Sequence, residues 1–172
     1  LLRAGKLADA LPVLRAVAQS KLESATTDAA RKQAATAYRN VAAIAARIDP
    51  AAAREAFARS ASLDAGNVDT LVWHGWLQLG AGNLDAAEAA FKALIEIDKS
   101  DPPGERALTA RLGLGDIAAR RGSLEAALDH SMRAAQIAGR LARGQTGNTA
   151  VQHTLAVAHQ RIGQAYLLQG NL

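Results

Sequence analysis

Apolar residues recur every three or four positions along most of this chain, and polar residues fill the positions between them. From residue 84 onward the apolar positions include Leu84, Ala87, Phe91 and Leu94, and the same spacing returns between residues 124 and 128. Side chains at this spacing lie on one face of an α-helix, whereas a half-buried strand alternates at every second residue. The pattern therefore predicts an all-α protein.

Glycine, proline and short polar residues divide the pattern into separate helices. The predicted helices cover residues 1–5 (the end of a first helix), 7–22, 28–47, 50–63, 67–81, 84–98, 103–121, 124–143 and 148–169. The stretch KSDPPGE (99–105) is predicted to be a linker and RGQTGN (143–148) a turn. Pro12 would lie about one turn inside its helix, where proline is tolerated better than deeper inside.

The composition agrees with a helical protein and excludes several kinds of site. Hydrophobic residues make up 49% of the chain but aromatic residues only 3%, and alanine, a strong helix former, is frequent. There is no cysteine for a disulfide or a thiolate zinc site, as is usual in a reducing compartment. No apolar run approaches the roughly 20 residues that span a bilayer, and no signal-peptide pattern follows Leu1. We expect a cytoplasmic location, no membrane insertion, and a chain that is a piece of a longer protein.

The net charge of +4 is divided into zones of opposite sign. Residues 31–59 carry six basic side chains against Asp49 and Glu55, while residues 68–100 carry five acidic side chains against two lysines. Nucleic-acid binding usually needs a single basic stripe with interleaved aromatic residues. Because the zones alternate, we expect no nucleic-acid partner.

One phrase of the sequence occurs more than once. The segment AAAREAFARSASLD (51–64) aligns with DAAEAAFKALIEID (85–98), which places Phe57 over Phe91, 34 residues later. The glycines also recur at a fixed spacing, since three of them lie seven residues before another glycine. The pairs are Gly75 with Gly82, Gly115 with Gly122, and Gly163 with Gly170. A fixed period of this length is typical of stacked helical repeats.

The glycine spacing predicts a pair of antiparallel helices in each repeat. The first glycine lets the two helices approach closely, and Ala87 and Ala127, each twelve residues later, are expected opposite Gly75 and Gly115. The second glycine ends the first helix, because glycine accepts the left-handed conformation at a helix C-terminus. The polar residue after it is expected to cap the next helix through its side chain. These polar residues are Asn83, Ser123 and Asn171.

These features resemble the tetratricopeptide repeat, whose period is 34 residues, and the resemblance covers almost the whole chain. The positions that match the family pattern are Leu71, Gly75, Ala87, Phe91 and Leu94 in the third unit, and Gly115, Ala127 and Ala134 in the fourth. Residues 147–172 resemble a longer bacterial variant of the repeat. The chain departs from the pattern at Val41, which replaces a small glycine, and at Arg111, which replaces a large apolar residue.

The resemblance implies a tetratricopeptide-type α-solenoid of stacked antiparallel helix hairpins that forms a right-handed superhelix. Residues 1–172 would be a single domain with a partial repeat at each end. A terminal hairpin without a neighbour leaves apolar side chains only partly covered, and such side chains favour association. We therefore expect self-association through a terminal helix. The residues expected to be partly covered are Leu7, Leu11 and Leu14 at one end and Ile162, Tyr166 and Leu167 at the other.

No motif in the chain predicts catalysis. GLGDIA (113–118) satisfies a Gly-x-Gly-x-x-Ala dinucleotide pattern, but its glycines fall inside a predicted helix, so close helix packing is the better interpretation. The four histidines are not spaced as paired metal ligands on one helix would be. They are His74, His130, His153 and His159. We expect no enzyme activity, no cofactor and no metal.

The resemblance also implies that the first helices of successive hairpins line a concave groove that binds partners. The implied groove residues are Tyr38, Val72, Trp73, Trp76, Leu112, Asp116, Arg120, Gln160 and Gln164. The family's carboxylate clamp needs lysine and asparagine at fixed places on these helices, and those places hold Tyr38 and Ala42, Val72 and Trp76, and Leu112 and Asp116 instead. Trp73 and Trp76 either contact a ligand, as aromatic side chains at interfaces do, or pack between hairpins.

The sequence is compatible with two functions. The leading interpretation is a scaffold that binds a peptide or helix of another protein through the groove. The alternative is a regulatory or sensor segment of a larger signalling enzyme whose catalytic domain lies outside this chain. A phosphate loop or a cyclase domain elsewhere in the full-length protein would favour the alternative.

Overall fold

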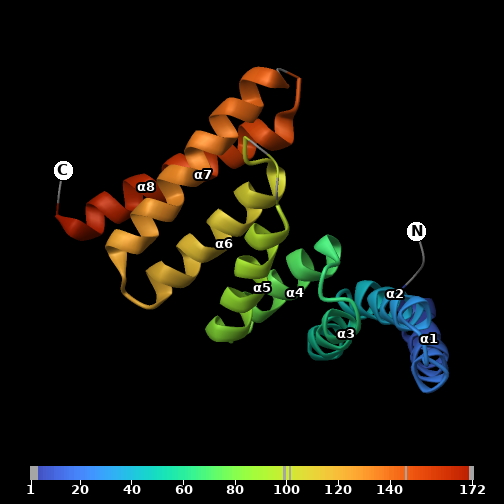
Figure 1. Cartoon of the computed structure of the whole chain (residues 1–172). Coiled ribbons are helices and arrows are strands. Elements are labelled where there is room, and N and C mark those ends of the chain that lie inside the picture. The colour runs from blue at the N-terminus through green and yellow to red at the C-terminus, as the bar shows by residue number, and fades with distance from the viewer. Residues whose placement is uncertain (1–3, 99, 101, 146, 171–172) are drawn as a thin grey trace. The chain divides into compact units, whose positions relative to one another are not determined.

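Eight α-helices and no β-strand make up the described part of the chain, which comprises residues 4–98, 100, 102–145 and 147–170 of a computed structural model (Figure 1). The helices are α1 (Ala4–Glu23), α2 (Asp28–Ala45), α3 (Pro50–Leu63), α4 (Val68–Gly80), α5 (Leu84–Ile97), α6 (Glu105–Arg120), α7 (Leu124–Gly144) and α8 (Thr149–Gln169). The all-α prediction is confirmed. From residue 28 onward, the predicted helix ends lie within two residues of the observed ones.

The first helix differs from the prediction. We expected one helix to end at Gly5 and another to begin at residue 7, but α1 is continuous from Ala4, and residues 1–3 lie outside the described part. Pro12 therefore lies about two turns inside α1 instead of one. Proline removes the hydrogen bond to the carbonyl four residues earlier. That carbonyl belongs to Ala8, which is exposed, so water can replace the missing N–H group.

The chain divides into two compact units. The first unit comprises residues 1–81 and contains α1 to α4, and the second comprises residues 82–172 and contains α5 to α8. The boundary falls in the turn between α4 and α5. The single domain and the right-handed superhelix that the resemblance implies stay predictions.

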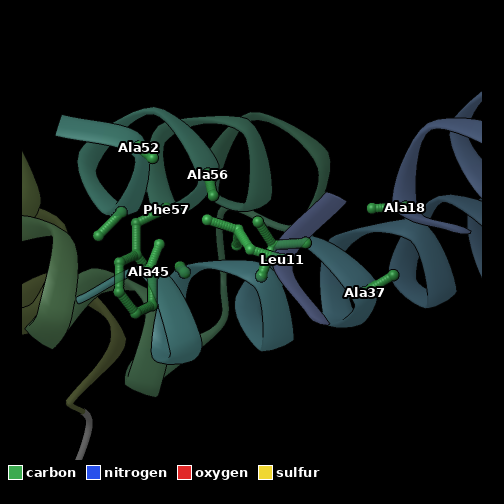
Figure 2. Packing of buried hydrophobic residues seen from close by; sticks show 10 residues of the cluster. Leu11, Ala18, Ala37, Ala45, Ala52, Ala56 and Phe57 are labelled. Carbon is green, nitrogen blue, oxygen red and sulfur yellow. The ribbon is translucent and has the colours of Figure 1, made fainter. Parts of the chain in front are cut away.

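In the first unit, successive helices pack on one another, α1 on α2, α2 on α3 and α3 on α4. The core of the first three helices consists mainly of alanine, with Leu11, Val41 and Phe57 as its larger members (Figure 2). Small side chains let helices approach closely, so few large residues are needed to fill the space between them. Val41, which replaces the glycine of the family pattern, is accommodated there with only 2% of its surface exposed.

The apolar residues near the start of the chain are better covered than expected. Leu7 and Leu11 are buried, and the expectation of partial exposure was wrong for both. The reason is that α1 packs on α2 with the face that carries these leucines, and turns Val13 and Val17 toward solvent instead. Partial exposure is confirmed for the other four residues, which are Leu14, Ile162, Tyr166 and Leu167.

In the second unit, α6 packs on both α5 and α7, and α8 packs on α7. The glycines of GLGDIA lie inside α6, so the close-packing interpretation is confirmed. A Cβ atom at Gly113 would lie 2.2 Å from the ring of Phe91 on α5. A Cβ atom at Gly115 would lie 3.3 Å from Ser131 Oγ and 3.6 Å from the carbonyl oxygen of Ala127, both on α7. Ala127 therefore lies opposite Gly115, as the spacing predicted.

The turn glycines adopt the predicted left-handed conformation, with φ of 81°, 76° and 71° at Gly82, Gly122 and Gly170. Asn83 and Ser123 occupy the N-cap positions of α5 and α7, as predicted, but neither side chain makes the capping hydrogen bond that such a residue usually makes. Asn171 lies outside the described residues. The N–H groups of Leu84 and Leu124 bond instead to the carbonyls of the preceding turn glycines, at 2.9 and 3.1 Å. The tight turn thus supplies an acceptor for the first N–H group of each helix.

Candidate protein-interaction surfaces

The predicted groove residues lie on four helices that are divided between the two units. In the first unit they are Tyr38 on α2 and Val72, Trp73 and Trp76 on α4. In the second unit they are Leu112, Asp116 and Arg120 on α6 and Gln160 and Gln164 on α8. Each unit therefore offers its own candidate surface, and a groove that includes both stays a prediction.

A chain of hydrogen bonds fixes the start of α4 in the first unit. The side-chain oxygen of Asn67 accepts bonds from the backbone N–H and the hydroxyl of Thr70, both at 3.0 Å. The buried hydroxyls of Thr70 and Ser60 are 3.2 Å apart, and Ser60 donates to the carbonyl of Ala35 on α2 at 2.9 Å. Two hydroxyl protons serve these three hydroxyl contacts, which join α2, α3 and α4 through the fully buried Ser60 and Thr70 and the partly buried Asn67. They hold α4 and its tryptophans in place.

One face of the Trp73 ring packs on another aromatic ring, while much of the side chain is exposed. Its ring stacks on Phe57 of α3, with the ring centroids 6.3 Å apart and the ring planes 9° apart. Phe57 is only 3% exposed, whereas Trp73 is 55% exposed. Val72 and Trp76, on the same helix, are partly buried. The first unit therefore displays an apolar surface on α4 with Trp73 as its most accessible member.

Tyr38 contributes less to this surface than the resemblance implies. Its ring packs against the core of the first unit and is partly buried. Its hydroxyl donates a hydrogen bond to Gln19 Oε1 on α1 at 3.0 Å. One turn later, Ala42 is fully buried. The α2 positions that correspond to the family's clamp therefore serve mainly to pack the unit.

In the second unit an ion pair joins α6 and α8, the helices that carry the predicted groove residues. Asp116 Oδ2 on α6 lies 2.7 Å from Arg161 Nη2 on α8, and both side chains are about one quarter exposed. Burial raises the pKa of the Asp116 carboxyl, and the charges of Arg161 and Arg120 oppose that rise only in part. The pair lines a small cavity of about 110 Å³ together with Gln164 and Leu168. Arg161 Nη1 is buried there without a hydrogen-bond partner in the described part of the chain.

The other groove residues of the second unit do not line this cavity. Leu112 is 8% exposed, so it packs inside the unit and offers little surface to a ligand. Arg120 and Gln160 are exposed on α6 and α8. Of the five residues predicted for this unit, the structure brings together Asp116 and Gln164.

Sequence reasoning missed two residues that support these surfaces. Arg161 was not selected although it follows Gln160 directly, and an acidic residue at the groove position of α6 was a signal that a basic partner on α8 should be sought. Phe57 was used only to set the repeat period. Its position sixteen residues before Trp73 gave no sign that the two rings stack.

These observations describe a helical-repeat protein whose exposed aromatic and polar side chains suit the binding of other proteins. A family model described as tetratricopeptide repeat matches residues 46–102 and 74–143, which together include more than half of the chain. The chain belongs to the tetratricopeptide-repeat family. Such repeats generally mediate protein–protein interactions, and members of the family are typically non-catalytic scaffolds. The search of curated proteins gave no match.

Two further features bear on possible ligands. None of the described helices combines the length and the apolar character needed to cross a membrane. Within the same residues, no three side chains of histidine, cysteine, aspartate or glutamate gather as ligands of a metal ion would.

Proposed function

We propose that this protein is an interaction scaffold that binds a peptide or helix of a partner protein along the first helices of its hairpins, with Trp73 as the main anchor. The observation that carries this proposal is the exposure of Trp73, 55%, combined with its stacking on the buried Phe57 ring. Tryptophan is enriched among the residues that dominate binding energy at interfaces. A ring already held on one face also loses little conformational freedom when a ligand covers the other.

The chemistry of the two units indicates what kind of ligand would fit. Val72 and Trp76 extend the apolar surface around Trp73, so the first unit suits an apolar side chain of the ligand. In the second unit Arg120, Gln160 and Gln164 carry charged or amide groups that can bond to polar groups of a ligand. We therefore propose that the first unit binds an apolar residue of a partner segment and that the second unit, by itself, can bind polar groups. The expected cytoplasmic location and the absence of a catalytic role stay predictions.

Panning a display library of random peptides on the whole chain tests this function. Peptides enriched on the wild-type chain are synthesised, and their affinities are measured by fluorescence anisotropy. Trp73→Ala should weaken binding about tenfold or more, which corresponds to about 1.4 kcal/mol. Met132→Ala in the second unit is the matched control, since Met132 is 51% exposed but lies outside the proposed surface.

The affinity pattern decides the outcome. The proposal holds if the peptides lose affinity for Trp73→Ala and keep it for Met132→Ala. It fails if no enriched peptide depends on Trp73 while circular dichroism shows the variant to be as helical as the wild-type chain.

A further inference from the structure

A separate groove of about 500 Å³ lies on the second unit, between α5, α6 and α7. Apolar residues form its floor, and they include Ile95, Leu114, Ile117 and Ala126. Charged and polar side chains stand around them, among them Arg111 of α6 and His130 of α7. None of these residues belongs to the surface proposed above.

The groove is associated with a departure from the repeat pattern. Arg111 stands where the pattern has a large apolar residue, forty residues after Leu71, just as Gly115 stands forty residues after Gly75. Leu71 is buried, at 5% exposed, whereas Arg111 is partly exposed and lines the groove. A guanidinium group on a flexible stem cannot fill an apolar site as leucine does, because its charged head stays close to water. Arg111 thus places a positive charge beside an apolar floor.

The other cations near this groove have carboxylate partners. Arg121 bonds to Glu88 and Asp85, and Lys92 bonds to Glu88 at 2.6 Å. On α7 the side chain of Arg133 bonds to both carboxylate oxygens of its neighbour Asp129. Among the described residues, no carboxylate lies within 4.0 Å of the Arg111 guanidinium, whose hydrogen-bonding partner is His130 Nδ1 at 3.3 Å. Among the described cations of this groove, Arg111 has no carboxylate at ion-pair distance, although the charge of Asp129 acts on it from farther away.

The contact with His130 orients the arginine. A guanidinium group can only donate, so Nδ1 accepts and the ring is neutral with its proton on Nε2. Burial, followed by the nearby charge of Arg111, lowers the pKa of His130, which keeps the ring in this neutral form. Burial also lowers the pKa of Arg111 itself. A guanidinium group that is partly removed from water and held on one side is suited to a bidentate carboxylate contact.

We propose that Arg111 and His130 form the anion-binding end of a second docking groove, which binds a partner segment that carries an aspartate or glutamate next to apolar residues. The carboxylate pairs with Arg111, and the apolar side chains cover Leu114, Ile117 and Ala126. Glu88 and Glu96 line the groove together with the basic Lys92, Arg111 and Arg121, so its charges are nearly balanced and it lacks the single basic stripe that nucleic acid needs. The expected ligand therefore has one or two carboxylates. This inference does not depend on the surface around Trp73.

Panning the same peptide library on the Trp73→Ala chain isolates this groove from the first surface. The enriched peptides should contain Asp or Glu beside apolar residues. Replacing that residue by Gln or Asn in the peptide should weaken binding about tenfold. Arg111→Gln should weaken binding of the unchanged peptide by a similar factor. When the substituted peptide is measured on the Arg111→Gln chain, the affinity should fall little further, because both changes remove the same contact.

Arg106→Gln provides the matched control, since Arg106 is an exposed arginine on the same helix that does not line the groove. It should leave the affinity unchanged, and Arg111→Lys should restore part of what Arg111→Gln loses, because lysine keeps the charge without the planar fork. The proposal is overturned if the Trp73→Ala chain enriches no acidic peptides, or if their affinity is the same for Arg111→Gln and Arg106→Gln. Tighter binding of an oligonucleotide or a phosphopeptide at Arg111 would also overturn it.

Discussion

Two glycines inside helices of the second unit have opposite surroundings. Gly113 on α6 faces the ring of Phe91 so closely that a Cβ atom would lie 2.2 Å from a ring carbon. Gly163 on α8 has no atom within 4 Å of the place where a Cβ would stand. Glycine weakens a helix interior by its flexibility, so it stays advantageous only where a side chain would not fit. The first glycine is required by packing, and the second is not required by any contact in the described structure.

Substitution of these two glycines by alanine should change the free energy of unfolding in opposite directions. Gly113→Ala should lower the free energy of unfolding by about 1–3 kcal/mol, because Phe91 is buried and its ring has to move. Gly163→Ala should raise the free energy of unfolding by up to about 1 kcal/mol, since alanine favours the helix and meets no neighbour. Denaturant unfolding followed by circular dichroism measures both. Equal effects of the two substitutions would contradict the packing described for α5 and α6.

At the scale of whole elements, the helices of this chain begin in different ways. The side chain of Asn148 caps α8 by accepting from the N–H groups of Ala150 and Val151 at 3.1 and 3.3 Å. Ser123 stands at the start of α7 without such a bond. At α6 the cap comes from the preceding linker, where Asp98 accepts from the N–H group of Ala107 at 3.0 Å.

The contacts of Asp98 join the end of α5 to described residues at the start of α6. Burial raises the pKa of its carboxyl, but hydrogen bonds from Ser100 and from the backbone N–H groups of Ala107 and Gly104 outweigh burial and hold the pKa below its usual value. The ionised carboxylate therefore ties the end of α5 to the start of α6. Asp98 thus supplies a side-chain acceptor at the start of α6, where the residue before the helix is Gly104 and has no side chain to act as a cap.

These differences predict unequal effects of removing a cap residue. Asn148→Ala should lower the free energy of unfolding by about 1 kcal/mol, because two N–H groups at the start of α8 lose their acceptor. Ser123→Ala should change the free energy of unfolding by less than about 0.5 kcal/mol, since the Ser123 side chain makes no capping hydrogen bond that the substitution would remove. Both residues lie in the second unit, so thermal unfolding followed by circular dichroism compares them directly. A larger loss for Ser123→Ala would show that its hydroxyl does act as a cap.

At the scale of the whole molecule, the last helix leaves apolar surface uncovered. Tyr166, Leu167 and Leu168 of α8 are 38%, 56% and 70% exposed. On α6, the face that carries Gly115 is covered by α7, whereas the equivalent Gly163 on α8 is open. Large apolar side chains exposed on a helix in this way favour association. We therefore propose that copies of this chain associate through α8.

The association has a direct test. The average mass of the chain, followed by light scattering over a wide concentration range, should rise with concentration. Leu167→Glu combined with Leu168→Glu should hold the mass near that of one chain, because charge on this face opposes its burial. Val13→Glu, a change at a residue of α1 that is 64% exposed, is the control and should leave the rise in place. A constant monomer mass for the unchanged chain would reject the proposal.

The sequence by itself determined the helices, the turns and the repeat, because these depend on neighbours within a few residues. The period of apolar positions located seven of the eight helices, and glycines at 82, 122 and 170 marked turns that need a positive φ. The prediction failed at α1, where Gly5 suggested the end of one helix and Pro12 suggested that the next helix begins about one turn before it. Gly5 keeps its N–H group and only weakens a helix, and Pro12 is tolerated because the carbonyl of Ala8, which loses its partner, is exposed. A local pattern does not reveal that exposure.

The tertiary structure alone decided which side chains meet. Asp116 and Arg161 are 45 residues apart, and Phe57 stacks on Trp73 from a different helix. The family pattern placed Leu112 in a groove, but the packing of α6 buries it. Contacts of this kind depend on how each helix is rotated and shifted against its neighbours, which results from the packing of all their side chains together. The apolar periodicity of one helix predicts which face is buried, but it does not predict the rotation and shift that bring particular side chains into contact.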